Sequence, residues 1–197
     1  MRDAIADRRP AEVTAGTRLT RRALAVVLFA VLTAMGAAIE VPMPGTLVPV
    51  TLQTLFVSLS GVLLGPMLGA MSQSVYLLAG ALGAPVFSGG DAGVGQLFGV
   101  TGGYLLAFPI AAAVTGRLAG PVPSRWTVPA AMRLWFAILI GTGVIFAGGA
   151  LQLALLTGNS ATAIQQGVLP FIIGDLLKVT VALLVALRYR ERTLEWL

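Results

Sequence analysis

Long runs of apolar residues, separated by short polar or glycine-rich stretches, dominate the chain after residue 22. Six runs are candidates for membrane spans, at residues 23–41, 50–65, 67–84, 101–118, 134–157 and 167–188. A helix needs about 20 mostly apolar residues to cross a bilayer, and in lipid its backbone groups are satisfied within the helix itself. The pattern therefore predicts an all-α integral membrane protein, built as a bundle of six transmembrane helices.

Basic residues mark the polar segments and fix the predicted topology. Of the 13 basic residues 12 are Arg, and they cluster before the first run, in the connection 117–133 and after the last run. Cytoplasmic loops collect Lys and Arg, whereas loops across the membrane do not. Six spans place all three clusters on one side, and the opposite connections, at 41–49, 85–100 and 158–166, contain no Lys or Arg. We therefore expect both the N- and C-termini to be cytoplasmic.

The same pattern divides the chain into three parts. Residues 1–22 are polar and Arg-rich and form a basic cytoplasmic N-terminal arm, residues 23–190 form the six-helix membrane domain, and residues 191–197 form a C-terminal tail. A cleaved signal peptide is the competing interpretation of residues 18–39. We favour a retained span because its apolar run is long for a signal peptide and has no polar exit.

Composition agrees with a membrane protein and removes much of the usual catalytic chemistry. The chain has 57% hydrophobic and 11% charged residues, a mean hydropathy of +0.90, and neither Cys nor His. Disulfides, zinc ligation, thiolate nucleophiles and His general bases are therefore absent, and the only Lys does not sit in an ATP-binding P-loop. We expect no enzyme activity and no cofactor. Topology accounts for the net charge of +5, so we expect a lipid bilayer and no nucleic acid as partner.

Asp175 and Lys178 are charges inside the sixth apolar run. Each costs about 2.5–3.5 kcal/mol near the bilayer centre, and spacing i, i+3 puts both on one helix face, which should face the bundle interior. Three interpretations follow: a structural ion pair, a proton relay, or a receptor with an ammonium for a ligand carboxylate and a carboxylate for ligand N–H groups. The lack of other intramembrane acids weakens the relay.

Several uncharged polar residues also lie in or next to the apolar runs. The candidates for ligand contact are Gln53, Tyr76, Thr101 and Tyr104, together with Gly90 in the outer connection. The competing interpretation of each polar side chain is a hydrogen bond between helices. Nine of the 24 glycines fall between Gly80 and Gly103. Such bare backbone cannot face lipid, so this connection should pack on protein or line a cavity.

Small residues recur at every fourth position in the first run, at Ala30, Ala34 and Ala38. This spacing puts them on one helix face and allows close approach of a second helix. That helix could belong to the same bundle or to another subunit. The oligomeric state, monomer or homo-oligomer, stays open at this point.

Several strings of residues, in order along the chain, carry a resemblance to a known family. They are Pro49–Thr54 (PVTLQT), Leu64–Pro66 (LGP), Tyr76–Gly90 (YLLAGALGAPVFSGG), Gly99–Pro109 (GVTGGYLLAFP) and Phe171–Lys178 (FIIGDLLK). Together they resemble the BioY family, the biotin-capturing S components of energy-coupling factor (ECF) transporters, from about residue 23 to 190. The sequence departs from the family at Val100 and Ile173, where a proline is common, and neither departure removes a polar side chain.

The resemblance implies a fold, a ligand and partners. It implies a six-helix S component in the cell membrane of a prokaryote that captures biotin from outside. A transmembrane T component and two ATPase subunits would be its partners and would hydrolyse the ATP. It assigns Asp175 and Lys178 to the biotin site and the Gly-rich connection to the part that covers the ligand. Ala30 and Ala34 match the family's helix-1 surface for the T component.

Other functions compete with this one. The nearest is an S component for a different vitamin. A transporter that works alone on an ion gradient belongs to another class, as does a structural membrane anchor without a ligand. The balanced charge of Asp175 and Lys178 favours a ligand with both an anionic group and N–H donors over a cationic one.

Overall fold

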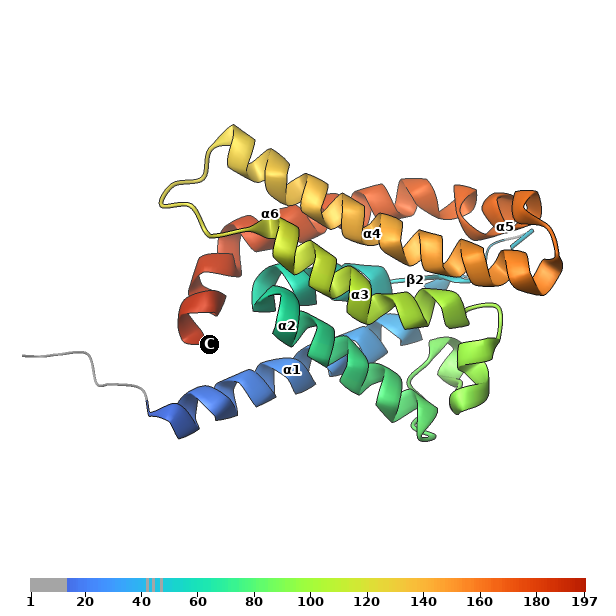
Figure 1. Ribbon diagram of the computed structural model, residues 1–197, viewed down its shortest axis with the longest axis horizontal. Helices are drawn as coiled ribbons and strands as arrows, with labels where there is room; N and C mark the ends of the chain where they lie inside the picture. Colours follow the sequence, from blue (N-terminus) through green and yellow to red (C-terminus); the bar gives the residue numbers. More distant parts are fainter. Residues whose placement is uncertain (1–13, 42, 44, 47) are drawn as a thin grey trace, which may run out of the picture.

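The structure is a computed structural model that describes residues 14–41, 43, 45–46 and 48–197 (Figure 1). Its helices are α1 (Ala15–Ala38), α2 (Gln53–Ala81), α3 (Gly102–Ala119), α4 (Val128–Thr157), α5 (Ser160–Gly167) and α6 (Ile172–Trp196). Short 3-10 turns are η1 (Ser88–Gly90), η2 (Val94–Phe98) and η3 (Leu169–Phe171). The strands β1 (Glu40–Val41) and β2 (Val50–Thr51) pair antiparallel, with Glu40 opposite Thr51. The predicted all-α class is confirmed, and the small β-ladder was not predicted.

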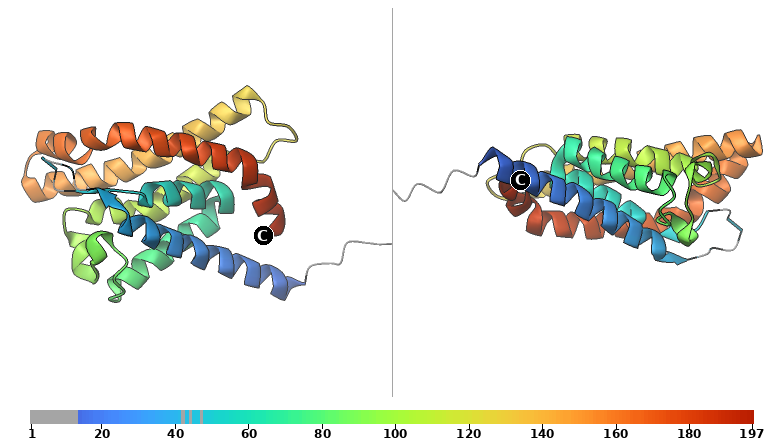
Figure 2. Two further views of the ribbon diagram at one scale, coloured as in Figure 1. Left: turned by 180° about the vertical axis from the view of Figure 1, so that it is seen from behind. Right: turned by 90° about the horizontal axis from the view of Figure 1, so that it is seen from below.

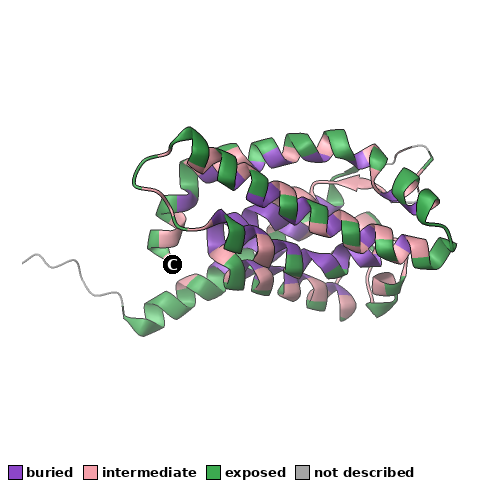
Figure 3. Cartoon of the chain, turned by 45° about the horizontal axis from the view of Figure 1, so that its top comes forward, coloured by how far each residue is buried: buried purple, intermediate pink, exposed green. Residues whose placement is uncertain are grey.

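Five helical segments are long and apolar enough to cross a membrane: α1, α2, α3, α4 and the segment Ser160–Trp196. Many large apolar residues on these helices are exposed, and the buried residues lie on the sides of the helices that face the centre of the bundle (Figure 3). Leu78 and Ile173, for example, are 61% and 83% exposed. Such a surface is unsuited to water and suited to acyl chains. The chain is a multi-pass membrane protein.

Helix α2 is two helical arms that fold back on each other. Gly65, with φ 81° and ψ 177°, breaks the helix in a conformation open only to glycine, and Pro66 starts the second arm. Gln53 Nε2 donates to Tyr76 Oη at 2.6 Å, although on one straight helix these residues would lie about 35 Å apart. The predicted runs 50–65 and 67–84 therefore correspond to the arms 53–64 and 66–81, which run antiparallel.

The first arm of α2 lies at the centre of the bundle. Residues 57–64 are all buried, as expected for a helix that is apolar on every side. Beside it, Gln73 joins α1 to both arms, because its side chain bonds Thr33 Oγ1 and Ser60 Oγ at 3.2 and 3.1 Å. All three side chains are fully buried. Hydrogen bonds between helices thus add to apolar packing here.

Two ends of the molecule are distinct. The start of α1, the α3–α4 connection and the end of α6 lie together at one end, which carries the described arginines (Figures 1 and 2). Arg21 Nη1 donates to the main-chain oxygen of Trp196 at 3.1 Å and so ties α1 to α6 there. The β-ladder, η1, η2 and α5 lie at the opposite end.

Several predicted boundaries differ from the structure. Helix α1 begins at Ala15, inside the predicted arm 1–22, because Thr14 caps it and arginines are good helix formers; residues 1–13 lie outside the described residues. Helix α6 continues through the predicted tail 191–197 as far as Trp196. The predicted outer loop 158–166 contains α5, whose first turn is capped by the Asn159 side chain.

Candidate functional site

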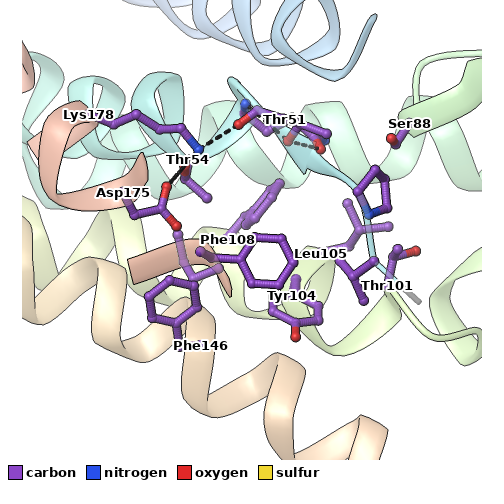
Figure 4. Close-up of a pocket in the computed structure, with 15 residues that line it drawn as sticks. Thr51, Thr54, Ser88, Thr101, Tyr104, Leu105, Phe108, Phe146, Asp175 and Lys178 are labelled. Atoms are coloured by element: carbon purple, nitrogen blue, oxygen red, sulfur yellow. Dashed lines mark hydrogen bonds and ion pairs between the residues drawn. The ribbon is translucent and has the colours of Figure 1, made fainter. Parts of the chain in front are cut away.

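A cavity opens at the end of the bundle opposite the arginines, and Figure 4 shows the side chains that line it. Residues from β2, the start of α2, η1, α3, α4, η3 and α6 surround it. Its lining consists of Val48, Pro49, Thr51, Gln53, Thr54, Ser88, Thr101, Tyr104, Leu105, Phe108, Ile145, Phe146, Phe171, Asp175 and Lys178. The cavity thus combines a mostly apolar wall with a few polar groups, as small-molecule sites commonly do.

Asp175 and Lys178 form an ion pair at the edge of this cavity. Lys178 Nζ lies 2.7 Å from Asp175 Oδ1, and the side chains are 12% and 5% exposed for Lys178 and Asp175. Helix α6 positions them one turn apart on its inner face, and the positive end of its dipole favours a carboxylate in the first turn, where Asp175 lies. The expectation that both charges face the interior is confirmed.

Lys178 has no hydrogen-bond donor to spare in this structure. Its ammonium has three N–H groups, and they meet Asp175 Oδ1 at 2.7 Å, the main-chain oxygen of Thr51 at 2.7 Å and Thr54 Oγ1 at 3.2 Å. A ligand anion that binds Lys178 must replace one of these acceptors. The bond to Thr54 is the longest, so it is the easiest to exchange.

Thr54 also orients the carboxylate. Its hydroxyl donates to Asp175 Oδ1 at 2.8 Å, the same oxygen that Lys178 meets. Within the part of the chain that the structure describes, every hydrogen bond to this carboxylate falls on Oδ1. Asp175 Oδ2 therefore keeps its full capacity to accept N–H groups from a ligand (Figure 4).

Three further predicted residues line the cavity, and the polar atoms of two of them bond to protein. Gln53 donates to Tyr76 Oη and accepts from Thr51 Oγ1 at 2.9 Å. Tyr104 Oη donates to the main-chain oxygen of Gly167 at 2.6 Å, which joins α3 to α5. Thr101 lies at the start of α3 on the cavity wall. Gln53 and Tyr104 thus shape the site by joining helical segments. This agrees with the competing interpretation of polar residues in spans, which is a hydrogen bond between helices.

The structure does not bring Tyr76 and Gly90 to the cavity wall. Tyr76 is 1% exposed and lies behind Gln53, where it donates to the main-chain oxygen of Val86 at 3.1 Å. Gly90 is exposed on η1, and Ser88 of the same turn lines the cavity in its place. The tight turn with positive φ at both Gly89 and Gly90 aims Ser88 inward and these glycines outward.

Sequence reasoning missed Thr54 and the aromatic wall. Thr54 belongs to the string PVTLQT, and its polar side chain one residue after Gln53 was the available signal. Phe108, Phe146 and Phe171 gave no signal, because apolar residues occupy nearly every position of a membrane helix. In the structure these three rings come from α3, α4 and η3 and meet around the cavity.

The small-residue face of α1 lies against the protein's own interior at Ala30. This residue is 6% exposed and packs in the same apolar cluster as Val48 and Val57, while Ala34 is half-buried beside it. The outward face of α1 instead presents larger residues such as Leu28 and Met35. Ala34 packs partly against the same cluster, so the two alanines lie toward the bundle and not on the outward face of α1.

Among the residues that the structure describes, no group of three or more acidic side chains is placed to hold a metal ion. The functional groups of the cavity are therefore those of the ion pair, the threonines, Ser88 and the aromatic wall.

Comparison with known proteins gives a consistent result. A family model described as the BioY family matches residues 7–195. A probable biotin transporter BioY from Pyrococcus horikoshii is 40% identical over 168 residues, covering 85% of this chain and 95% of that protein. The biotin transporter BioY of Thermotoga maritima is 36% identical over 176 residues, covering 89% and 99%.

The fold also has a counterpart among solved structures. A crystal structure of the S component for biotin from an ECF-type ABC transporter superposes with a TM-score of 0.78, covering 90% of this chain and 94% of that one at 21% identity. At that identity the match concerns the fold. Together with the sequence matches over nearly the whole chain, it leads to one conclusion: the chain belongs to the BioY family.

Proposed function

We propose that this protein is the biotin-binding, substrate-capture subunit of an ECF-type vitamin transporter. The observation that carries the proposal is the buried Asp175–Lys178 pair beside an apolar, aromatic-walled cavity in a member of the BioY family. The relatives in that family are named as biotin transporters. Transport of a bound vitamin, without catalysis on it, is the role that fits this site.

The cavity matches the three chemical parts of biotin. The ureido group has two N–H donors, and Asp175 Oδ2 is an acceptor with no protein partner among the described residues. The thiophane ring is apolar and suits the wall of Phe108, Phe146 and Phe171. The valerate is an anion and suits Lys178, which would exchange its bond to Thr54 for the ligand carboxylate. Charge-assisted bonds of this kind contribute about 1.5–3 kcal/mol each.

For the membrane topology we propose six spans, with α2 contributing its two arms. The first arm has room for only about 18 Å of helix, less than the hydrocarbon core, but its burial by protein removes the need to face lipid. The arginine-rich end faces the cytoplasm by the positive-inside rule, and the cavity therefore opens outward in the plasma membrane of a prokaryote. We also propose the division given by the sequence: a basic cytoplasmic N-terminal arm at residues 1–22, a membrane domain at 23–190 and a C-terminal tail at 191–197.

The partners we propose are a transmembrane T component and two ATPase subunits. The sequence has no P-loop, so energy from ATP must come from other chains. Ala34, with Ala30 at its flank, is the candidate contact for the T component. The alternative is a transporter that works alone on an ion gradient. Uptake by the reconstituted chain under a proton gradient, without T component or ATP, would support that alternative.

Equilibrium binding of radiolabelled biotin tests the proposal. We expect the purified protein to bind biotin and to keep it in the presence of excess thiamin and riboflavin. Asp175→Asn should weaken binding at least tenfold, whereas Asp91→Asn, which changes an exposed acid outside the cavity, should leave it unchanged. Unchanged affinity in Asp175→Asn would remove Asp175 from the site.

A ligand analogue separates the two ends of biotin. Biotinamide lacks the carboxylate, so the wild type should bind biotin more tightly than biotinamide if Lys178 pairs with the valerate. In Lys178→Met that preference should disappear while biotinamide still binds. A preference that survives in Lys178→Met would place the valerate elsewhere and assign Lys178 to the ureido end.

A further inference from the structure

An apolar groove lies at the arginine-rich end, between α1, the end of the first arm of α2 and α6. Most of its lining is hydrocarbon or aromatic, and Arg192 stands at one side. The apolar side chains include Leu24, Leu28, Phe29, Leu63, Leu64 and Trp196. Leu24 and Leu28 are 59% and 55% exposed, so the groove is open on the face that lipid covers. It is distant from the biotin cavity and shares no lining residue with it.

A second, polar hollow adjoins the groove at Trp196. Its lining consists of Arg18, Arg21, Arg22, Glu195, Trp196 and Leu197. Trp196 lines both spaces, so the apolar groove leads directly into the basic hollow. Tryptophan is enriched at this depth of membrane proteins, where one side of the ring is apolar and the other is wet.

Two arginines of the hollow bond to the end of α6. The Arg21 guanidinium lies 5.5 Å from the centre of the Trp196 ring and donates to that residue's main-chain oxygen. Arg22 Nε donates to the main-chain oxygen of Leu197 at 3.2 Å. Each guanidinium has five N–H donors, and these bonds use one donor of each arginine. Among the described residues, the hollow is lined by three cations, Arg18, Arg21 and Arg22, and by one acid, Glu195.

We infer that the groove and the hollow together bind one phospholipid with an anionic headgroup. An acyl chain fills the groove between α1 and α6, and the headgroup phosphate lies in the hollow beside Arg21 and Arg22, next to the part of the groove that Arg192 lines. The occupant must be apolar at one end and anionic at the other, and it must reach the site from within the bilayer. An anionic lipid has this chemistry, and basic side chains near a membrane surface attract such lipids by about 1 kcal/mol each.

Trp196 provides a direct probe. The chain has three Trp, so replacing Trp126 and Trp135 by Phe leaves Trp196 as the only indole. The protein is placed in phosphatidylcholine nanodiscs that contain increasing fractions of brominated phosphatidylglycerol or brominated phosphatidylcholine, whose bromine quenches nearby Trp. We expect half-maximal quenching at a several-fold lower fraction of the anionic lipid.

Charge variants test the headgroup contact. Arg22→Gln with Arg192→Gln should abolish the preference for the anionic lipid. Arg117→Gln with Arg125→Gln, which removes the same charge from the α3–α4 end outside the hollow, should retain it. Biotin binding reports that each variant is folded, and Arg18→Gln with Arg192→Gln replaces the first pair if it fails to fold.

Three results would overturn the inference. Equal quenching by the two lipids would mean that the groove has no preference for an anionic lipid, and a helix of a partner subunit would then be its occupant. An unchanged preference in the charge variant would place the headgroup elsewhere. Loss of the preference on adding soluble glycerol phosphate would show that the hollow binds free phosphate and not lipid.

Discussion

Arg190 Nε donates to the main-chain oxygen of Val62 at 2.8 Å. In an unbroken helix this oxygen would accept from the N–H of residue 66, but Pro66 has none. Arg190 Nη2 also donates, at 2.5 Å, to the main-chain oxygen of Gly120, where α3 has ended. One buried guanidinium thus satisfies two acceptors that the helix geometry leaves open.

Replacing this guanidinium should destabilise the protein. In Arg190→Met both carbonyl oxygens lose their donor, and a buried acceptor without a partner costs about 1–3 kcal/mol. We expect a clearly lower midpoint of thermal unfolding in detergent, with Arg188→Gln, an exposed residue on the same helix, as the unchanged control. Equal midpoints for Arg190→Met and the wild type would show that water satisfies both carbonyls.

The hydroxyl of Thr54 should contribute to biotin affinity. Thr54→Val keeps the shape of the side chain but removes the bond to Asp175 Oδ1, so the carboxylate loses one of the groups that orient it. We expect biotin affinity to fall about tenfold, equivalent to about 1.4 kcal/mol. Thr54→Ser should restore most of the affinity, and Thr180→Val, on the exposed face of α6, should have no effect. If Thr54→Val binds biotin as tightly as the wild type, the bond from Lys178 alone is enough to orient the Asp175 carboxylate.

The ion pair should show strong coupling in stability. Asp175→Asn leaves the Lys178 ammonium without its carboxylate, and Lys178→Met leaves the carboxylate without its cation. Breaking a buried pair from one side costs about 3 kcal/mol or more, whereas removing both charges costs less. We expect the double variant to unfold at a higher temperature than either single variant, measured without biotin. If the double variant loses as much stability as the two single variants together, the two charges are solvated independently.

Close packing of α3 on the α2 hairpin should make Gly116 intolerant of a side chain. A Cβ there would lie 2.6 Å from the main-chain oxygen of Gly61 and from the nitrogen of Pro66. Backbone cannot yield as a side chain can, so Gly116→Ala should destabilise the protein by about 1–3 kcal/mol. Gly143→Ala in α4 meets nothing within 4 Å and serves as the control. Similar unfolding midpoints for the two variants would mean that α3 shifts at no cost.

The sequence by itself predicted the class of fold and singled out the two charges that the structure places at the edge of the cavity. Apolar length marks a membrane span wherever it occurs, and arginines report on the side of the membrane, so both signals can be read along the chain without its neighbours. Asp175 and Lys178 stood out for the same reason, because a charge inside an apolar run needs a partner that lipid cannot supply. Helical spacing puts both on one face, and the cost of a charge in lipid turns that face inward.

Only the tertiary structure decided which groups surround that pair. Thr51 and Thr54 meet Lys178 across 127 and 124 positions of sequence, Tyr76 lies behind Gln53 because α2 folds back at Gly65, and Ala30 packs into the bundle. Apolar and polar patterns show which side of a helix is buried, but not which helix lies against it. That choice depends on how side chains of distant segments interlock, so the composition of the cavity wall appears only when the helices are packed.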